Sequence, residues 1–296
     1  MSLGIDLSPN SKQCNFDCLY CELAPMLTVA EQTQSIEVDT IIDALRPHLH
    51  DIVDVITLTA NGEPTLYPYL SELIDEIDKI KGSTETLILT NSATLVDNTI
   101  FDTLLKLDQV KLSLDAVSSD VFKKIDRPHT KIDVSQIVER VAAFSKVYTG
   151  KLFIEILFVH GINDTKEEIA KLNATLLGIN AERIDLGTID RPPAYPVMGI
   201  SYKELHEASL LFDSSLPVHI ASRVHAEPNN AYYSDEDIIN TLDKRPLTMD
   251  DINLLLDEDS KKRLELLVEN GQINKKSVSN LEFLVPQNNL NRKRKK

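Results

Sequence analysis

Long hydrophobic runs, basic residues and cysteine are all scarce in this sequence of 296 residues, and each shortage narrows the class of protein. No apolar run approaches the roughly 18–20 residues that a membrane-spanning helix requires, and the N-terminus shows no signal-peptide pattern. We therefore expect a cytoplasmic protein. The length allows one large domain, or a domain of about 200 residues followed by a small one.

Basic residues are outnumbered, with 31 Lys and Arg against 46 Asp and Glu, and the imbalance is uneven along the chain. Residues 1–243 contain 19 basic and 38 acidic residues, a net charge of −19, whereas residues 244–296 contain 12 and 8, a net charge of +4. An acidic surface repels the phosphate backbone, so we do not expect the first 243 residues to bind nucleic acids generally.

Cysteine occurs only three times, within eight residues, as Cys14-x3-Cys18-x2-Cys21. An odd number of clustered cysteines makes a poor disulfide framework, and thiolates suit zinc, copper(I) or an iron–sulfur cluster instead. A structural zinc site usually has four ligands, so one of the seven histidines would have to complete it, and none lies within the motif. An electron-transfer [4Fe-4S] cluster also uses four cysteines. Three thiolates on a four-iron cluster leave one iron open to a small molecule.

Short β-rich runs alternate with amphipathic helical segments over the first 220 residues. The expected strands are 3–7, 53–60, 86–90, 110–114, 152–159 and 183–188, with a weak seventh at 218–221. The expected helices between them are 39–50, 69–80, 97–107, 134–148, 166–177 and 202–212. The strands are nearly continuous apolar runs, which is typical of parallel strands covered by helices. This pattern predicts an α/β fold, either a doubly wound sheet or a partial (β/α)6 TIM-like barrel.

A different pattern begins near Ser234, which is a plausible helix N-cap, as is Thr248, while Gly271 is a plausible helix stop. The expected elements are helices at 235–242, 249–256 and 260–270 and strands at 272–275 and 281–285. Three helices followed by a hairpin are the pattern of a winged helix. The predicted domains are a core at 1–225, a winged-helix-like domain at 234–286 and a basic disordered tail at 287–296.

A winged helix can bind nucleic acid or protein, and its recognition helix indicates which. Here that helix offers only Lys261, Lys262 and Arg263 as basic residues, so nucleic-acid binding is not the favoured interpretation.

Polar loop residues follow the predicted strands at their carboxyl ends. They are the cysteine loop and the segments 61–64, 91–92, 115, 160–164 and 190–193. In both candidate folds these strand ends share one edge, where ligands bind. The loops contain Asn, Asp or Glu rather than only Ser or Lys, which favours one shared ligand site over ordinary polar loops.

The cysteine motif, with Tyr20 beside its last cysteine, resembles the signature of the radical S-adenosylmethionine (radical SAM) superfamily. The similarity covers roughly residues 3–220, and it implies the partial barrel. Further segments in the same order resemble the bacterial branch related to wyosine tRNA-base synthases; they are 2–9, 61–64, 125–129, 161–164 and 190–193. Relatives usually carry residues upstream of the first strand, so we also weigh a truncated start.

The resemblance implies one [4Fe-4S] cluster on Cys14, Cys18 and Cys21, with S-adenosylmethionine bound to the open iron through its amino and carboxylate groups. An electron from a flavodoxin- or ferredoxin-like donor would break the sulfonium bond. Methionine and a 5′-deoxyadenosyl radical result, and the radical abstracts hydrogen from a substrate, as in an oxidoreductase or transferase.

The substrate stays open between a tRNA base, a peptide and a small metabolite. With all three cysteines used, the chain cannot hold a second thiolate-ligated cluster, which argues against sulfur insertion. The alternative function is an iron–sulfur or zinc-binding regulator that contacts nucleic acid through the C-terminal unit.

Seven residues are expected to contact S-adenosylmethionine: Tyr20, Gly62, Glu63, Asn91, Ser113, Asp115 and Asn163. By resemblance, the Glu63 carboxylate would bind the ammonium group, and the competing interpretation is an acid at a helix N-terminus. Gly62 would permit a close backbone approach. Ser113 and Asp115 alternate on a strand and therefore share a face, which in the family contacts ribose or carboxylate. Asn163 resembles a contact to adenine, or alternatively a helix cap.

Four further polar residues have less defined expectations. Strand alternation predicts that Glu155 points into the barrel with Leu157, where a buried carboxylate needs a partner. Candidates for the substrate side are Arg127, His129 and Arg191. The competing interpretation is that the two arginines anchor loops through Asp126 and Asp190.

Overall fold

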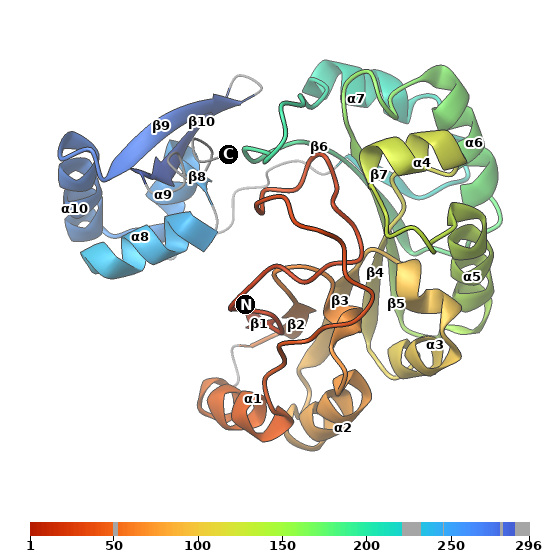
Figure 1. The fold of residues 1–296 in the computed structure, drawn as a ribbon, viewed down its shortest axis with the longest axis horizontal. Coiled ribbons are helices and arrows are strands. Elements are labelled where there is room, and N and C mark those ends of the chain that lie inside the picture. The colour runs from red at the N-terminus through yellow and green to blue at the C-terminus, as the bar shows by residue number, and fades with distance from the viewer. Residues whose placement is uncertain (50–52, 221–231, 245, 279–280, 288–296) are drawn as a thin grey trace. The chain divides into compact units, whose positions relative to one another are not determined.

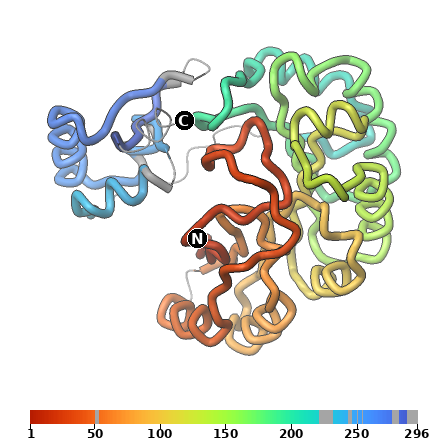
Figure 2. Tube along the Cα trace, in the orientation of Figure 1, coloured from red at the N-terminus to blue at the C-terminus, as the bar shows by residue number. Residues whose placement is uncertain are grey.

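The structure, a computed structural model, describes residues 1–49, 53–220, 232–244, 246–278 and 281–287. The chain divides into two compact units, Met1–Thr188 with Ala194–Ala221 and Ile189–Pro193 with Ser222–Lys296. None of the helices described is long and apolar enough to cross a membrane. Figure 2 traces the path of the chain through each unit.

The first unit is built on a seven-stranded parallel sheet in which neighbours in space are also neighbours in sequence. Its strands are β1 Ser2–Asp6, β2 Val55–Thr59, β3 Glu85–Thr90, β4 Gln109–Ser113, β5 Lys151–Phe158, β6 Arg183–Thr188 and β7 Val218–Ile220. A doubly wound sheet would reverse its strand order at a switch point, and this sheet does not. The α/β fold with a partial (β/α)6 TIM-like barrel is therefore confirmed.

Helices follow the strands and lie along the outer side of the sheet (Figure 1). They are α1 Val38–Leu45, α2 Leu70–Ile80, α3 Asn98–Leu104, α4 Ser119–Ile125, α5 Val134–Val147, α6 Lys166–Leu176 and α7 Tyr202–Ser209. Three 3-10 turns, η1 Arg46–His48, η2 Pro64–Leu66 and η3 Ala93–Val96, complete the connections.

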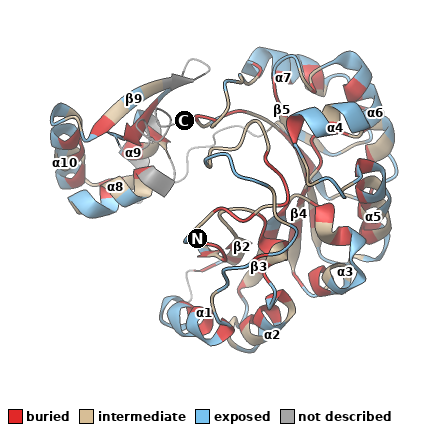
Figure 3. Cartoon of the chain, viewed as in Figure 1, coloured by how far each residue is buried: buried red, intermediate tan, exposed pale blue. Residues whose placement is uncertain are grey.

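Strand residues alternate between two environments, as Figure 3 shows by colour. On β5, Ile154 and Ile156 are fully buried against the helices, whereas Glu155 between them is half-buried. The same alternation on neighbouring strands places Lys111 and Asp185 on the side of Glu155. We call this side, opposite the helices, the inner face of the sheet.

The predicted helices 39–50, 97–107 and 202–212 each extend several residues past the observed end, and one helix was missed. The helix expected at 39–50 ends at Leu45, and a 3-10 turn follows that contains Pro47, which has no N–H to continue an α-helix; residue 50 lies outside the described residues. Helix α4 was not expected from the sequence. It is seven residues long, too short to show a periodic pattern, although Phe122 and Ile125 are buried.

The second unit contains the three helices and the two-strand hairpin expected from its sequence, together with a short strand, β8, that was not expected. They are α8 Asp235–Lys244, β8 Leu247–Thr248, α9 Met249–Leu255, α10 Glu258–Glu269, β9 Ile273–Val278 and β10 Leu281–Pro286. The strands form an antiparallel sheet in the order β8-β10-β9. Thr248 caps α9, Ser234 accepts from the Asp237 amide at the start of α8, and Gly271, with a φ of 71°, follows α10. The tail from residue 288 lies outside the described residues.

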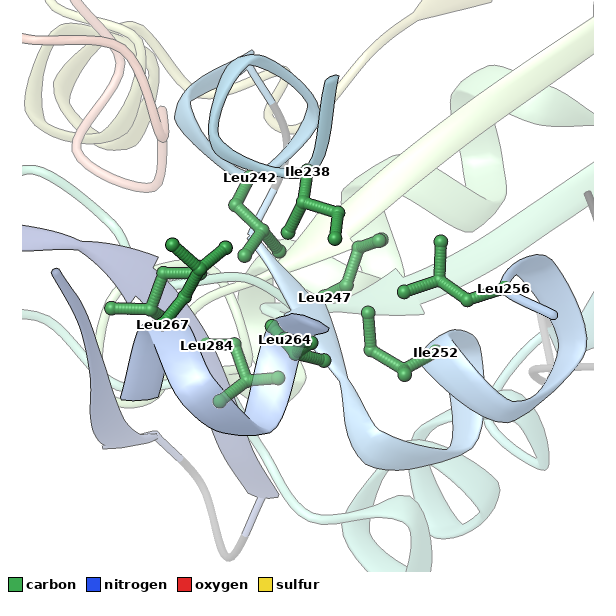
Figure 4. Close-up of a cluster of buried hydrophobic side chains, with 9 residues drawn as sticks. Ile238, Leu242, Leu247, Ile252, Leu256, Leu264, Leu267 and Leu284 are labelled. Atoms are coloured by element: carbon green, nitrogen blue, oxygen red, sulfur yellow. The ribbon is translucent and has the colours of Figure 1, made fainter. Parts of the chain in front are cut away.

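A purely aliphatic cluster forms the core of this unit (Figure 4). Its labelled members are Ile238, Leu242, Leu247, Ile252, Leu256, Leu264, Leu267 and Leu284. The basic side chains of α10 are paired within the unit: Lys261 with Glu258, Lys262 with Asp259, and Arg263 with Asp235.

Candidate cofactor site

The cysteine loop is joined at its start to the turn after β2. Gln13 N donates to Asn61 O at 2.9 Å, and Glu63 N donates to Gln13 O at 2.9 Å. Gly62 lies between them with a φ of 140°, and a Cβ there would lie 1.9 Å from the Gln13 oxygen. The close approach expected at Gly62 is thus present, and the neighbour is the backbone that leads into Cys14.

Residues 125–129 run along the other side of the loop. Asp17 N donates to Asp126 O at 3.1 Å, Leu19 N donates to Ile125 O at 2.8 Å, and His129 N donates to Asn15 O at 2.8 Å. His129, a candidate for the substrate side, therefore also supports the cysteine loop through its backbone. The loop is closed by Ala194 N, which donates to Cys21 O at 2.8 Å.

Arg127 anchors the cysteine loop, but not through the acid expected from the sequence. Its guanidinium lies 3.4 Å from Asp17 Oδ2 and stacks 4.6 Å above the centroid of the Tyr195 ring, whose hydroxyl also donates to Asp17. The expected partner, Asp126, is buried instead beside Cys18, out of this ion pair. Arg191 belongs to the segment grouped with the second unit, so its role stays a prediction.

The three thiols lie close enough for their charges to interact, and their surroundings differ. Cys14 Sγ accepts from Phe16 N at 3.4 Å and lies 3.8 Å from Asn91 Nδ2. Cys18 Sγ lies 3.5 Å from an Asp126 carboxylate oxygen, and Cys21 faces the side chain of Lys12.

Burial raises the pKa of all three thiols. The pKa of Cys14 rises to about 12, mainly through burial and secondly through the charge of Glu63. The pKa of Cys18 is also raised, by burial and then by Asp126. For Cys21, burial raises the pKa and the charge of Lys12 partly offsets it. The chain alone therefore favours neutral thiols, and bound metal cations would favour thiolates.

In the described part of the chain, no three His, Cys, Asp or Glu side chains are gathered closely enough to hold a single metal ion. A zinc ion would need its sulfur ligands at about 2.3 Å. In a four-iron cluster each thiolate binds a different iron, so the sulfurs stand farther apart. Three thiols on one loop at the strand ends, with no fourth cysteine in the sequence, fit such a cluster.

Lys12 and Asp17 belong to this site, and the sequence analysis missed both. The Lys12 side chain is 7% exposed, and its ammonium lies 3.4 Å from Asp17 Oδ1. Burial alone would lower the pKa of Lys12, but the charges that Cys21 and Asp17 carry when ionised outweigh burial and raise it. The available signal was the presence of two residues of opposite charge in a loop that was expected to bind a ligand.

Glu63 is buried and held by four hydrogen bonds. Its Oε1 accepts from the amide and hydroxyl of Thr65 at 3.0 and 2.6 Å and from the Thr90 hydroxyl at 2.6 Å, and its Oε2 accepts from Asn91 N at 2.8 Å. Glu63 is also the N-cap of η2, so the helix-terminus interpretation describes one of its contacts. Burial raises the pKa of this carboxyl despite these donors.

Four of the seven expected cofactor residues line one pocket: Tyr20, Asn91, Ser113 and Asp115. Asp126 and apolar side chains, among them Phe16 and Phe122, complete its wall. The Tyr20 hydroxyl donates to Asp115, and Leu157 N donates to Asp115 Oδ1 at 2.7 Å. Burial raises the pKa of Asp115 to about 7.

Asn163 is fully buried and uses its side chain within the chain. Its Nδ2 donates to Asp115 O at 2.8 Å and to Leu157 O at 2.9 Å, and its Oδ1 accepts from Val159 N at 2.8 Å. Asn163 thus fixes the loop after β5, and the cap of α6 is Thr165 instead. An adenine contact by Asn163 stays a prediction.

Glu155 lies on the inner face, as strand alternation predicted. Its partner is Lys111, at 2.7 Å, which also contacts Asp185 at 3.1 Å. The Glu155 side chain is 43% exposed, so this carboxylate is less buried than expected.

Comparison with known proteins assigns the chain to one family. Residues 11–172 match the radical SAM superfamily. Over 286 residues the chain is 38% identical to a UPF0026 protein of Helicobacter pylori (strain ATCC 700392 / 26695), covering 95% of this chain and 92% of that protein. The chain belongs to the radical SAM superfamily and, within it, to the UPF0026 proteins. The cofactors predicted from the sequence, a [4Fe-4S] cluster and S-adenosylmethionine, are those of this superfamily.

Solved structures share the fold at low sequence identity. A radical SAM methyltransferase from Sphaerobacter thermophilus superposes with a TM-score of 0.59 at 15% identity, covering 75% of this chain and 66% of that one. Streptococcus suis SuiB bound to S-adenosylmethionine gives 0.55 at 17% identity, covering 81% and 53%. The narrower resemblance to wyosine tRNA-base synthases stays a prediction.

Proposed function

We propose that this radical SAM enzyme reductively cleaves S-adenosylmethionine at a cluster held by Cys14, Cys18 and Cys21 and so begins hydrogen abstraction from a substrate. The observation that supports this most directly is the set of three thiols without a fourth, on a loop fastened to the strand ends. When bound, the cluster supplies the single electron that breaks the sulfonium bond.

The roles of the other residues follow from their positions. The buried Glu63 carboxylate, beside Cys14, is suited to bind the ammonium of S-adenosylmethionine in a charge-assisted hydrogen bond. The pocket of Tyr20, Asn91, Ser113 and Asp115 offers hydroxyl, amide and carboxyl groups for the ribose or carboxylate of the same ligand. Its apolar wall excludes water from one side of the site.

We extend the proposal to the partners. A flavodoxin- or ferredoxin-like protein donates the electron, the reaction is that of an oxidoreductase or transferase, and a modified tRNA base is one substrate class. The second unit serves as a winged-helix-like binding domain. Because the basic residues of α10 are each paired with an acid, protein is a better-supported partner for that helix than nucleic acid.

Anaerobic reconstitution tests the function. The chain supplied with iron, sulfide, a reductant and S-adenosylmethionine should bind about four irons and release 5′-deoxyadenosine. Ser214→Ala, at an exposed position away from the cysteine loop, serves as the control and should behave like the wild type. One bound zinc per chain and no 5′-deoxyadenosine would contradict the proposal and favour the regulator.

A further inference from the structure

The charges around the cysteine loop are arranged asymmetrically. An acidic side chain stands beside one of the thiols, because an Asp126 carboxylate oxygen lies 3.5 Å from Cys18 Sγ. A cation, Lys12, is buried in the same loop, two residues before Cys14.

Lys12 is held in this position rather than resting on the surface. Its side chain is 7% exposed, and its Nζ lies 3.4 Å from Asp17 Oδ1. Asp17 is itself 8% exposed and is fixed by the Arg127 guanidinium, the Tyr195 hydroxyl and the Met26 amide. Lysine loses considerable side-chain entropy on burial, so a buried, fixed ammonium two residues before a ligand indicates a specific electrostatic role.

An added electron makes a thiolate-bound cluster more negative, and a fixed cation nearby stabilises that charge. The stabilisation is large where water is excluded, because the effective dielectric constant is low. Groups that are not ligands are known to shift the reduction potential of iron–sulfur clusters. They act through the net charge around the cluster and through hydrogen bonds to its sulfur atoms.

We propose that Lys12 is a positioning residue for the cluster, whose fixed positive charge within the cysteine loop raises the reduction potential and so favours the reduced state. The step concerned is the transfer of one electron from a low-potential flavodoxin- or ferredoxin-like donor, which is oxidised, to the cluster, which is reduced. No bond or proton of Lys12 changes. This inference rests on the proposed cluster at the three cysteines.

The test compares Lys12→Gln, which removes the charge but keeps a hydrogen-bond donor, with Lys12→Arg, which keeps the charge. Each is reconstituted anaerobically, its iron and sulfide are counted, and its midpoint potential is measured by a redox titration followed by electron paramagnetic resonance. The equilibrium constant for reduction of the cluster should be at least tenfold smaller in Lys12→Gln than in the wild type. For one electron this corresponds to a midpoint potential that is more negative by about 59 mV or more. Lys12→Arg should stay near the wild type. Lys203→Met removes a charge from an 86% exposed side chain on α7 and should leave the potential unchanged.

The outcomes separate this inference from the proposed function. A wild-type potential in a fully loaded Lys12→Gln protein overturns the role of Lys12 and leaves the function intact. A wild-type chain that takes up no four-iron cluster overturns both. A lower potential in Lys12→Gln alone supports the charge-dependent role, whereas a potential lowered equally in Lys12→Gln and Lys12→Arg contradicts it.

Discussion

Three acidic side chains at the strand-end edge and one on the inner face of the sheet have pKa values displaced in opposite directions. At the strand-end edge, burial raises the pKa values of Glu63, Asp115 and Asp126. On the inner face, burial of Asp185 is outweighed by Arg183 and Lys111, and its pKa is lowered. The inner face balances its own charges, whereas burial at the edge disfavours the charged forms of acids and thiols unless a cationic ligand binds there.

The comparison is tested most strongly at the cysteines. Cys18→Ala should abolish cluster absorbance and all cleavage of S-adenosylmethionine, because a four-iron cluster with two protein ligands is not retained. Glu63→Ala should keep the cluster and weaken S-adenosylmethionine binding by roughly 10- to 100-fold, the value of a hydrogen bond to a charged group. Iron analysis and calorimetric titration measure the two effects, and equal iron loss in both variants would contradict the assigned roles.

The next largest effect concerns the turn that supports the edge. Gly62→Ala should lower the free energy of unfolding by about 2–3 kcal/mol, because its φ is positive and its Cβ would collide with the Gln13 carbonyl. Urea denaturation of the metal-free chain measures the loss. Gly4→Ala is the matched control, since a Cβ at Gly4 meets nothing within 4 Å. Similar stability of the two variants would mean that the turn does not constrain the cysteine loop.

A substitution of Asn163 tests whether the conformation of the strand-end edge depends on hydrogen bonds within the chain. Asn163→Ala removes three partners of backbone groups and should cost about 2 kcal/mol of unfolding free energy. Asn180→Ala, at an exposed position, should cost little. A variant that unfolds normally but loses only S-adenosylmethionine affinity would instead assign Asn163 to the ligand.

The smallest effect is expected on the inner face, and it depends on pH. Because the folded-state pKa of Asp185 is lowered, its stabilising contribution is present above its unfolded value of 3.8 and is lost as the pH falls through the folded value. Asp185→Asn should therefore cost about 1 kcal/mol at pH 7, and the gap to the wild type should close in acid. Urea midpoints at pH 7 and pH 3 measure it; a gap that widens in acid would contradict the sign.

The fold was largely predictable from the sequence because each strand is a continuous apolar run and each long helix has a clear period. Helix α4 was too short for that signal. The site was predictable only in part. Cysteine spacing identifies ligands by their chemistry, whereas Lys12, Asp17 and Tyr195 meet through tertiary contacts that no local pattern records. The predicted partner of Arg127 was wrong for the same reason. Two acids were possible partners, and Asp126 is buried beside Cys18, so Arg127 pairs with Asp17 instead.

The fastening of the cysteine loop has a consequence for biosynthesis. The loop meets partners from three distant parts of the chain, and Tyr195 and Asp17 are 178 residues apart. Contacts so remote in sequence form late, after the parallel strands between them have assembled. A nascent chain on the ribosome therefore exposes its three thiols long before the cysteine loop can adopt its folded conformation. We expect iron to be loaded only after translation has passed Tyr195.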